Sequence, residues 1–101
     1  METGSYLLLG LAESDKISFN STAHGSGRRM SRKKAAQTIK GKELAQDMKK
    51  RGIYVKAVSF HGLAEEAGIA YKDISEVVEA LELAGISAKV AKFLPIGNIK
   101  G

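Results

Sequence analysis

The densest group of chemically capable residues in the chain is the run His24-Gly25-Ser26-Gly27-Arg28. Gly25 and Gly27 remove side chains where a phosphate group would approach the backbone, and the neighbouring N–H groups can form an anion-binding concavity. Ser26 adds a hydroxyl, and Arg28 can donate a forked pair of hydrogen bonds to phosphate oxygens. His24 can act as a nucleophile, a general base or a metal ligand. The run therefore fits a phosphate-handling site.

The same run also has a plainer interpretation. Gly, Ser and Arg are ordinary loop residues, and a single histidine is more often a surface residue or a hydrogen-bonded core group than a catalytic one. The run is not a P-loop either, because its glycine spacing differs and no Gly-Lys-Ser/Thr follows it. Local spacing leaves both interpretations open.

The positive charge of the chain is concentrated in one stretch. Eleven basic and two acidic residues lie in the range 16–51, against five basic and six acidic residues from Gly52 onward. Clustered Lys and Arg attract polyanions directly and by counterion release, so a nucleic-acid partner is one interpretation, and a solvated helical surface is the other. Arg29 and Arg32 extend the charge of Arg28 towards the next helix.

The composition also restricts the class of protein. The 101 residues contain no cysteine, so the chain can build neither a disulfide framework nor a thiolate metal site. The strongly apolar run over residues 6–12 is far shorter than the roughly 20 residues of a membrane span. We expect a cytoplasmic protein with no membrane partner.

A strand and two helices are expected to position the histidine run. Residues 5–9 are not alternating in polarity, which predicts a strand buried on both faces, and residues 13–29 are expected to form the loop that holds His24. Ser31 can cap a helix over residues 32–39. Gly41 interrupts that helix, and a second short helix follows and stops at Gly52.

The second half of the chain adds two strands and the best-marked helix. Residues 53–59 alternate in polarity and predict a strand. Asp73 opens a capping-box pattern, and the helix that follows it ends at Gly85. A last strand is expected over residues 88–94, followed by an irregular tail after Pro95. The order β-loop-α-α-β-α-β predicts an α+β fold, and three strands would bury only a thin core.

Short motifs are spread along the whole chain. One is the stretch Ser21-Thr-Ala-His-Gly-Ser-Gly-Arg-Arg-Met-Ser-Arg32, and the others are Thr3–Tyr6, Arg51–Val55, Ala64–Ala67, Ala70–Asp73 and Pro95–Gly101. In their order they resemble motifs of the RtcB family of RNA ligases, and the first is similar to the family's histidine motif. The resemblance implies that residues 1–101 are a single C-terminal segment of an RNA-ligase catalytic domain, part of a larger α+β fold, and that the upstream metal-binding part is absent.

Members of this family are GTP- and manganese-dependent enzymes. They join an RNA 3'-phosphate or 2',3'-cyclic phosphate to a 5'-hydroxyl, in tRNA splicing and RNA repair, and the resemblance implies that His24 accepts GMP from GTP. The residues implied for nucleotide binding are Ser5, Gly25, Ser26, Gly27, Tyr71 and Lys100. Those implied for RNA phosphates, from tRNA halves or broken RNA, are Arg28, Arg29 and Arg32.

Several of these residues also have plainer interpretations. Ser5 fits an ordinary strand residue, Tyr71 a half-buried aromatic before a helix, and Lys100 a tail lysine. Glu65 and Glu66 are sequence neighbours whose side chains usually point apart, so we expect salt bridges or helix-start charges rather than a joint acid-base role.

The chain departs from the family pattern in its metal ligands and at two further positions. The family's manganese ligands lie upstream, His24 is the one plausible ligand here, and His61 is expected to be a loop histidine without chemistry. We therefore expect no metal site and an isolated chain that is inactive. Glu2 stands where Gly is usual, and its carboxylate would repel phosphate. Gly68 stands where Pro is usual, which would loosen the loop before Tyr71.

Three functional hypotheses follow. The first is a fragment or split subunit of an RNA ligase. The second is a non-catalytic basic RNA-binding module, which metal-dependent guanylylation would distinguish from the first. The third is the remnant of a broken gene, which predicts weakly cooperative thermal unfolding.

Overall fold

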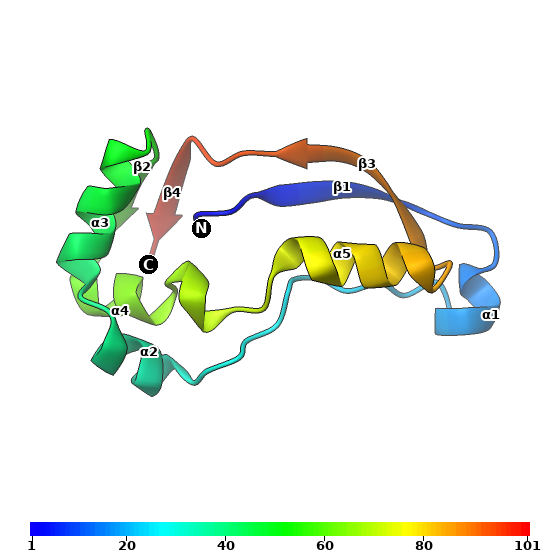
Figure 1. Ribbon diagram of the computed structural model, residues 1–101, viewed down its shortest axis with the longest axis horizontal. Helices are drawn as coiled ribbons and strands as arrows, with labels where there is room; N and C mark the ends of the chain where they lie inside the picture. The colour runs from blue at the N-terminus through cyan, green and yellow to red at the C-terminus, as the bar shows by residue number, and fades with distance from the viewer. The chain divides into compact units, whose positions relative to one another are not determined.

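The computed structural model describes residues 1–101, which form five α-helices, one 3₁₀ helix and four strands (Figure 1). The elements are β1 (Ser5–Gly10), α1 (Ser14–Ser18), α2 (Arg32–Thr38), α3 (Gly41–Lys50), β2 (Tyr54–Ala57), α4 (Phe60–Glu65), η1 (Gly68–Ala70), α5 (Ile74–Leu83), β3 (Ser87–Phe93) and β4 (Gly97–Lys100). The strands form two separate pairs, an antiparallel β1–β3 pair and a parallel β2–β4 pair. The predicted α+β class is confirmed.

The chain divides into two compact units, each described here by itself. Unit 1 comprises residues 1–3, 28–71 and 95–101, and unit 2 comprises residues 4–27 and 72–94. Unit 1 holds α2, α3, β2, α4, η1 and β4, and unit 2 holds β1, α1, α5 and β3. None of the helices has the length and apolar character that a membrane crossing would require.

Unit 1 is built on three helices. The Oγ of Ser31 accepts a hydrogen bond from the Lys34 N–H (3.2 Å), so the predicted N-cap of α2 is confirmed. A Cβ at Gly41 would lie 1.8 Å from the Phe60 carbonyl oxygen, so only glycine lets the start of α3 approach α4 this closely. The last turn of α3 is closed at Gly52, as predicted, by a hydrogen bond from the Ile53 N–H to the Met48 carbonyl.

Two elements of unit 1 differ from the sequence predictions. The short helix α4 lies beyond the predicted strand, where Ser59 caps it by accepting a hydrogen bond from the Gly62 N–H (3.0 Å). The strand β4 occupies the predicted irregular tail, because β2 supplies its backbone hydrogen bonds. The buried apolar residues of unit 1 are Ala35, Met48, Ile53, Leu63, Ala64, Ala67 and Ala70.

Unit 2 is an antiparallel strand pair with one helix packed on it. Figure 1 shows α5 on one side of β1 and β3, and the Tyr6 hydroxyl lies 3.1 Å from the Ser75 Oγ. The prediction that residues 5–9 are buried on both faces is wrong, because Leu7 and Leu9 are 51% and 60% exposed. A single helix can cover only one face of a two-stranded sheet.

In unit 2, helix α5 was predicted from the sequence, whereas helix α1 was not. Asp73 caps α5 by accepting a hydrogen bond from the Ser75 N–H (2.8 Å), and the helix ends before Gly85, as predicted. The predicted loop over residues 13–29 begins instead with α1. A helix of five residues is too short to show an apolar period in sequence.

Candidate functional site

The first four residues of the histidine run, His24 to Gly27, lie in an irregular segment of unit 2. After α1, Phe19 and Asn20 adopt left-handed backbone conformations, and the chain continues to Gly27 without a helix or strand. His24 is exposed, and the glycines on its C-terminal side, Gly25 and Gly27, have φ of +146° and +73°. Other residues rarely adopt these conformations, so the two glycines are required for the path of this loop.

Unit 1 begins directly after this loop, with the backbone of residues 28–30 aligned along η1. Arg28 and Tyr71 form an isolated antiparallel bridge. The Arg29 N–H donates to the Ala70 carbonyl oxygen at 2.9 Å, and the Arg29 Nε donates to the Ile69 carbonyl oxygen at the same distance. Backbone pairing thus fixes the start of this arginine-rich stretch.

The Arg28 guanidinium is engaged by groups of unit 1 on all three nitrogens. Its Nε donates to the Met30 carbonyl oxygen (3.1 Å), and its Nη2 donates to the Glu65 carbonyl oxygen (2.6 Å). Its Nη1 donates to the Tyr71 hydroxyl (2.8 Å) and lies 3.5 Å from a Glu66 carboxylate oxygen. The guanidinium also lies over the Tyr71 ring, 4.7 Å from the ring centre. Arg28 therefore holds this part of unit 1 together.

Tyr71 and Glu66 form a short hydrogen bond in which the phenol donates to the carboxylate. This bond, helped by the positive charges of Arg32, Arg28 and Lys100, holds the pKa of Glu66 below its ordinary value. Burial, with the adjacent carboxylate, raises the pKa of Tyr71. The two shifts agree, because a neutral phenol that donates to an ionised carboxylate stabilises both protonation states.

The remaining predicted site residues fall in both units. Arg32 is 66% exposed and its Nε lies 3.4 Å from Glu66. Lys100 is half-buried in β4, and Ser5 is exposed at the start of β1. Unit 1 therefore brings Arg28, Arg32 and Tyr71 around Glu66. Unit 2 holds Ser5 and the residues from His24 to Gly27.

Glu66 is the residue of this cluster that the sequence prediction did not place in the site. The predicted salt bridges are confirmed for Glu66, which pairs with Arg28 and Arg32. A Glu65 carboxylate oxygen lies 3.4 Å from His61 Nε2. His61 lies on α4 rather than in the predicted loop. The paired carboxylates were visible in the sequence, but their arginine partners lie more than thirty residues away along the chain.

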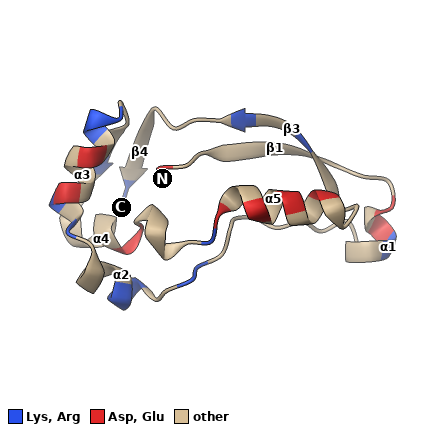
Figure 2. Cartoon of the chain, viewed as in Figure 1, with Lys and Arg blue, Asp and Glu red and all other residues tan.

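Six of the eleven basic residues in the range 16–51 lie on α2 and α3, namely Arg32, Lys33, Lys34, Lys42, Lys49 and Lys50. Figure 2 shows Lys and Arg on these two helices, whereas α5 carries acidic residues. Lys40 pairs with Glu43 on the same helix, and Arg51 pairs with Asp47 and Glu2. The exposed lysines outside these ion pairs are Lys33, Lys34, Lys42, Lys49 and Lys50. No ion pair of unit 1 involves these five exposed lysines, which are together named here the lysine face.

The donor groups of the chain do not fit a manganese ion. No group of three or more His, Cys, Asp or Glu side chains is arranged to hold a metal. His24 lies exposed in its loop, and His61 pairs with Glu65. A catalytic metal needs several ligands at fixed geometry.

Comparisons with known proteins give one consistent family. The family described as "tRNA-splicing ligase RtcB" matches residues 1–101. The tRNA-splicing ligases RtcB of Methanopyrus kandleri and Pyrococcus horikoshii are each 46% identical over 101 residues, which is all of this chain. The RNA-splicing ligase RtcB of Mycobacterium tuberculosis is 45% identical over the same length. The chain spans 10%, 12% and 23% of these three relatives.

Proposed function

The chain belongs to the RtcB family, whose named members are ligases, and we propose that it is the C-terminal segment of a GTP-dependent RNA ligase. Its reaction would join RNA 3'-phosphate or 2',3'-cyclic phosphate ends to 5'-hydroxyl ends, in tRNA splicing and RNA repair. The observation that carries the proposal is 46% identity to named ligases over the whole chain.

His24 is the proposed GMP acceptor. A ring nitrogen forms a bond to the α-phosphorus of GTP, the bond between the α-phosphorus and the bridging oxygen breaks, and pyrophosphate leaves. GMP then passes from His24 to the RNA 3'-phosphate. The 5'-hydroxyl oxygen forms a bond to the phosphorus of this activated 3'-phosphate, and GMP leaves. The exposure of His24 and the glycine conformations beside it support this role, since Gly25 and Gly27 leave the backbone open to a phosphate.

The resemblance implies six residues that would bind GTP. Gly25, Ser26 and Gly27 would line the phosphates, and Ser5 and Lys100 would contact the guanine end. Tyr71 would stack on the base. Because the Arg28 guanidinium already covers one face of the Tyr71 ring, the base would stack on the opposite face.

RNA is proposed to bind the lysine face together with the exposed Arg29 and Arg32. These side chains are accessible to phosphates, whereas Arg28 would first have to exchange its protein acceptors. The lysine face equally suits the second hypothesis, a non-catalytic RNA-binding module. Metal-dependent guanylylation distinguishes the two hypotheses, because only the ligase segment would form a GMP adduct.

The proposed partner, the remaining part of the ligase, would dock on the outer face of β1 and β3. A register shift between Leu7 and Leu8 places Val90 beside Ala91 on the face of Leu7. The uncharged residues of this outer face are Ser5, Leu7, Leu9, Ala88, Val90, Ala91 and Phe93. Lys89 and Lys92 point to the opposite face, where they contact Glu82 and Tyr6.

The composition of the outer face favours a protein segment over RNA, because no charge is present to attract phosphate. Unit 2 has one buried apolar residue, Val78, so it gains little hydrophobic stabilisation from its own core. The relatives are several times longer than this chain, so the missing cover is available within a complete ligase.

The test is reconstitution. The chain is mixed with α-labelled GTP, Mn²⁺ and the part of the Mycobacterium tuberculosis relative that lies outside the matched segment. We expect an acid-labile GMP adduct only in the complete mixture, and its loss in His24→Ala. Absence of the adduct from every mixture would favour the RNA-binding module.

A matched pair of variants tests the docking face. Leu9→Glu is expected to abolish association with the relative's segment, while Leu83→Glu, on an exposed α5 residue outside the face, keeps it. Both leucines are exposed, so neither change should alter the thermal midpoint of the chain. Self-association of the chain through the same face would contradict the proposal.

A further inference from the structure

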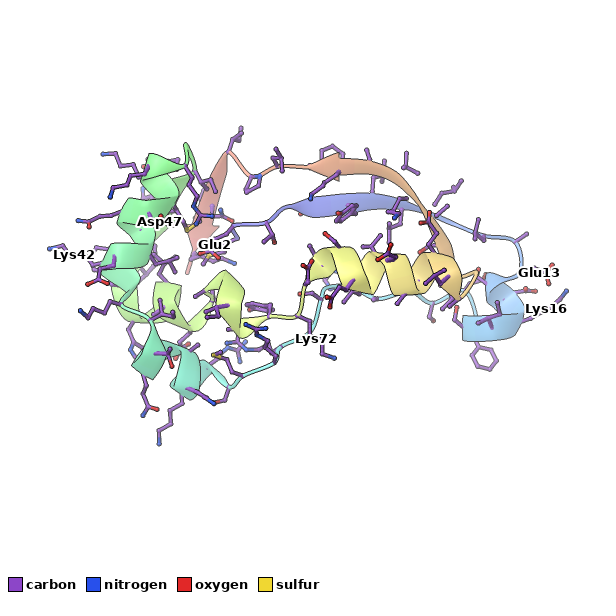
Figure 3. All side chains as sticks on the ribbon, in the orientation of Figure 1. Glu2, Glu13, Lys16, Lys42, Asp47 and Lys72 are labelled. Carbon is purple, nitrogen blue, oxygen red and sulfur yellow. The ribbon has the colours of Figure 1, made fainter.

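Glu2 and Gly68, which lie far apart in sequence, meet in one contact of unit 1. The Gly68 N–H donates to a Glu2 carboxylate oxygen at 2.8 Å. The other Glu2 oxygen lies 3.6 Å from the Arg51 guanidinium, and the Glu2 side chain is only 14% exposed. Figure 3 shows Glu2 and Asp47, which also pairs with Arg51, near each other in this unit.

Glycine at position 68 allows the Glu2 carboxylate to lie this close to the backbone. A Cβ there would lie 2.0 Å from the Glu2 oxygen, so a larger residue would require the carboxylate to shift. Proline has no N–H and would leave the carboxylate without this donor. Conversely, a glycine at position 2 would leave the Gly68 N–H without its acceptor, at a part-buried site where lost hydrogen bonds are costly.

Gly68 is also directly linked to Tyr71. It begins η1, and its carbonyl oxygen accepts a hydrogen bond from the Tyr71 N–H at 3.0 Å. The carbonyl of Ala70, within the same turn, accepts from the Arg29 N–H. Restraint at Gly68 therefore restrains the residue that carries the phenol ring.

We infer that Glu2 is a positioning residue: with Gly68 it forms a coupled pair that restrains η1 and thereby Tyr71. The Glu2 carboxylate is then occupied by the Gly68 N–H and Arg51, and does not act as a free charge against phosphate. This inference rests on the proposed function only where Tyr71 is assigned to the guanine base.

A double-mutant cycle tests the coupling in the isolated chain, without GTP. We expect Glu2→Gly and Gly68→Pro each to lower the thermal midpoint by about 5 °C, and the double variant to lose clearly less than the sum of the two. Glu2→Gln, whose amide oxygen can still accept from Gly68, should fall between wild type and Glu2→Gly. Additive losses in the double variant would overturn the inference.

A spectroscopic signature separates positioning from general stability. Glu2→Gly should shift the amide and ring resonances of Tyr71, and the double variant should return them towards wild type. The control Glu13→Gln changes a 67% exposed carboxylate in unit 2 and should leave Tyr71 unshifted. Unchanged Tyr71 resonances in Glu2→Gly would exclude a positioning role, whereas a failure of guanylylation alone would bear only on the proposed ligase.

Discussion

At the scale of single residues, the cluster around Glu66 sets the protonation states of Glu66 and Tyr71. One carboxylate accepts from the Tyr71 phenol and lies beside two arginines. Such an arrangement favours the ionised carboxylate and the neutral phenol together. All three guanidinium nitrogens of Arg28 donate to acceptors within unit 1. Its predicted contact with RNA phosphate therefore stays a prediction, because the same donors already have a structural role.

The lowered pKa of Glu66 predicts a loss of stability in acid. A carboxyl group whose pKa is lower in the folded than in the unfolded chain stabilises the fold at pH values above its pKa in the unfolded chain. Its contribution is lost as the pH falls from about its ordinary value of 4.5 through the folded pKa. Chemical denaturation at a series of pH values should therefore show a falling free energy of unfolding over this range.

Two variants make that measurement specific. Glu66→Gln removes the titrating group, so its stability should depend less on pH in the same range. Glu43→Gln changes a 68% exposed carboxylate in an ion pair on α3 and should retain the wild-type dependence. An unchanged profile in Glu66→Gln would contradict the assignment.

At the scale of elements, unit 1 is held together by the packing of α2 and α3 against α4. Leu63 on α4 is 1% exposed and Met48 on α3 is fully buried. The glycine at the start of α3 allows its backbone to approach Phe60. The helix that the sequence did not predict therefore supplies the centre of the core.

Truncation of the buried Leu63 side chain should lower the stability of the chain. Leu63→Ala is expected to lower the free energy of unfolding by about 2–5 kcal/mol, because it removes buried methyl groups and leaves a cavity. Leu83→Ala, the same change on an 86% exposed residue of α5, should alter stability little. Urea denaturation of the two variants measures the difference, and equal losses would place Leu63 outside the core.

At the scale of the whole molecule, the two units differ in how much apolar surface they bury. Seven of the eight buried hydrophobic residues belong to unit 1, and Val78 is the one in unit 2. Unit 2 instead exposes Leu7, Leu9, Val90 and Phe93 along one strand pair. Such a unit gains little stability from its own core, which is consistent with a proposed partner segment.

Hydrogen exchange should reveal this difference. Backbone amides in α3 and α4 are expected to exchange more slowly than those in β1 and β3, because local opening of a poorly buried unit costs less free energy. Addition of the relative's docking segment should slow exchange in β1 and β3 selectively. Equal protection of the two strand pairs and the helices in the isolated chain would contradict the prediction.

The sequence by itself determined the elements with strong local signals. The caps of Ser31 and Asp73 and the stops at Gly52 and Gly85 follow from hydrogen bonds and backbone conformations that involve neighbouring residues. The last long strand was predicted from its local residue pattern, although its hydrogen bonds go to the distant strand β1. The resemblance to the RtcB family followed from the order of short motifs, and the comparisons confirm the family. His24 and its glycines were identified in the same way as candidates, and their roles stay proposals.

Only the tertiary structure decided what depends on distant partners. The strand β4 exists because β2 offers it hydrogen bonds, and β1 is half-exposed because one helix covers one face. The same holds for Glu66, whose arginine partners are far away in sequence, and for Glu2, whose acceptor role depends on Gly68, sixty-six residues later. Local patterns contain no information on such contacts, because chain folding, not sequence spacing, brings these groups within hydrogen-bonding distance.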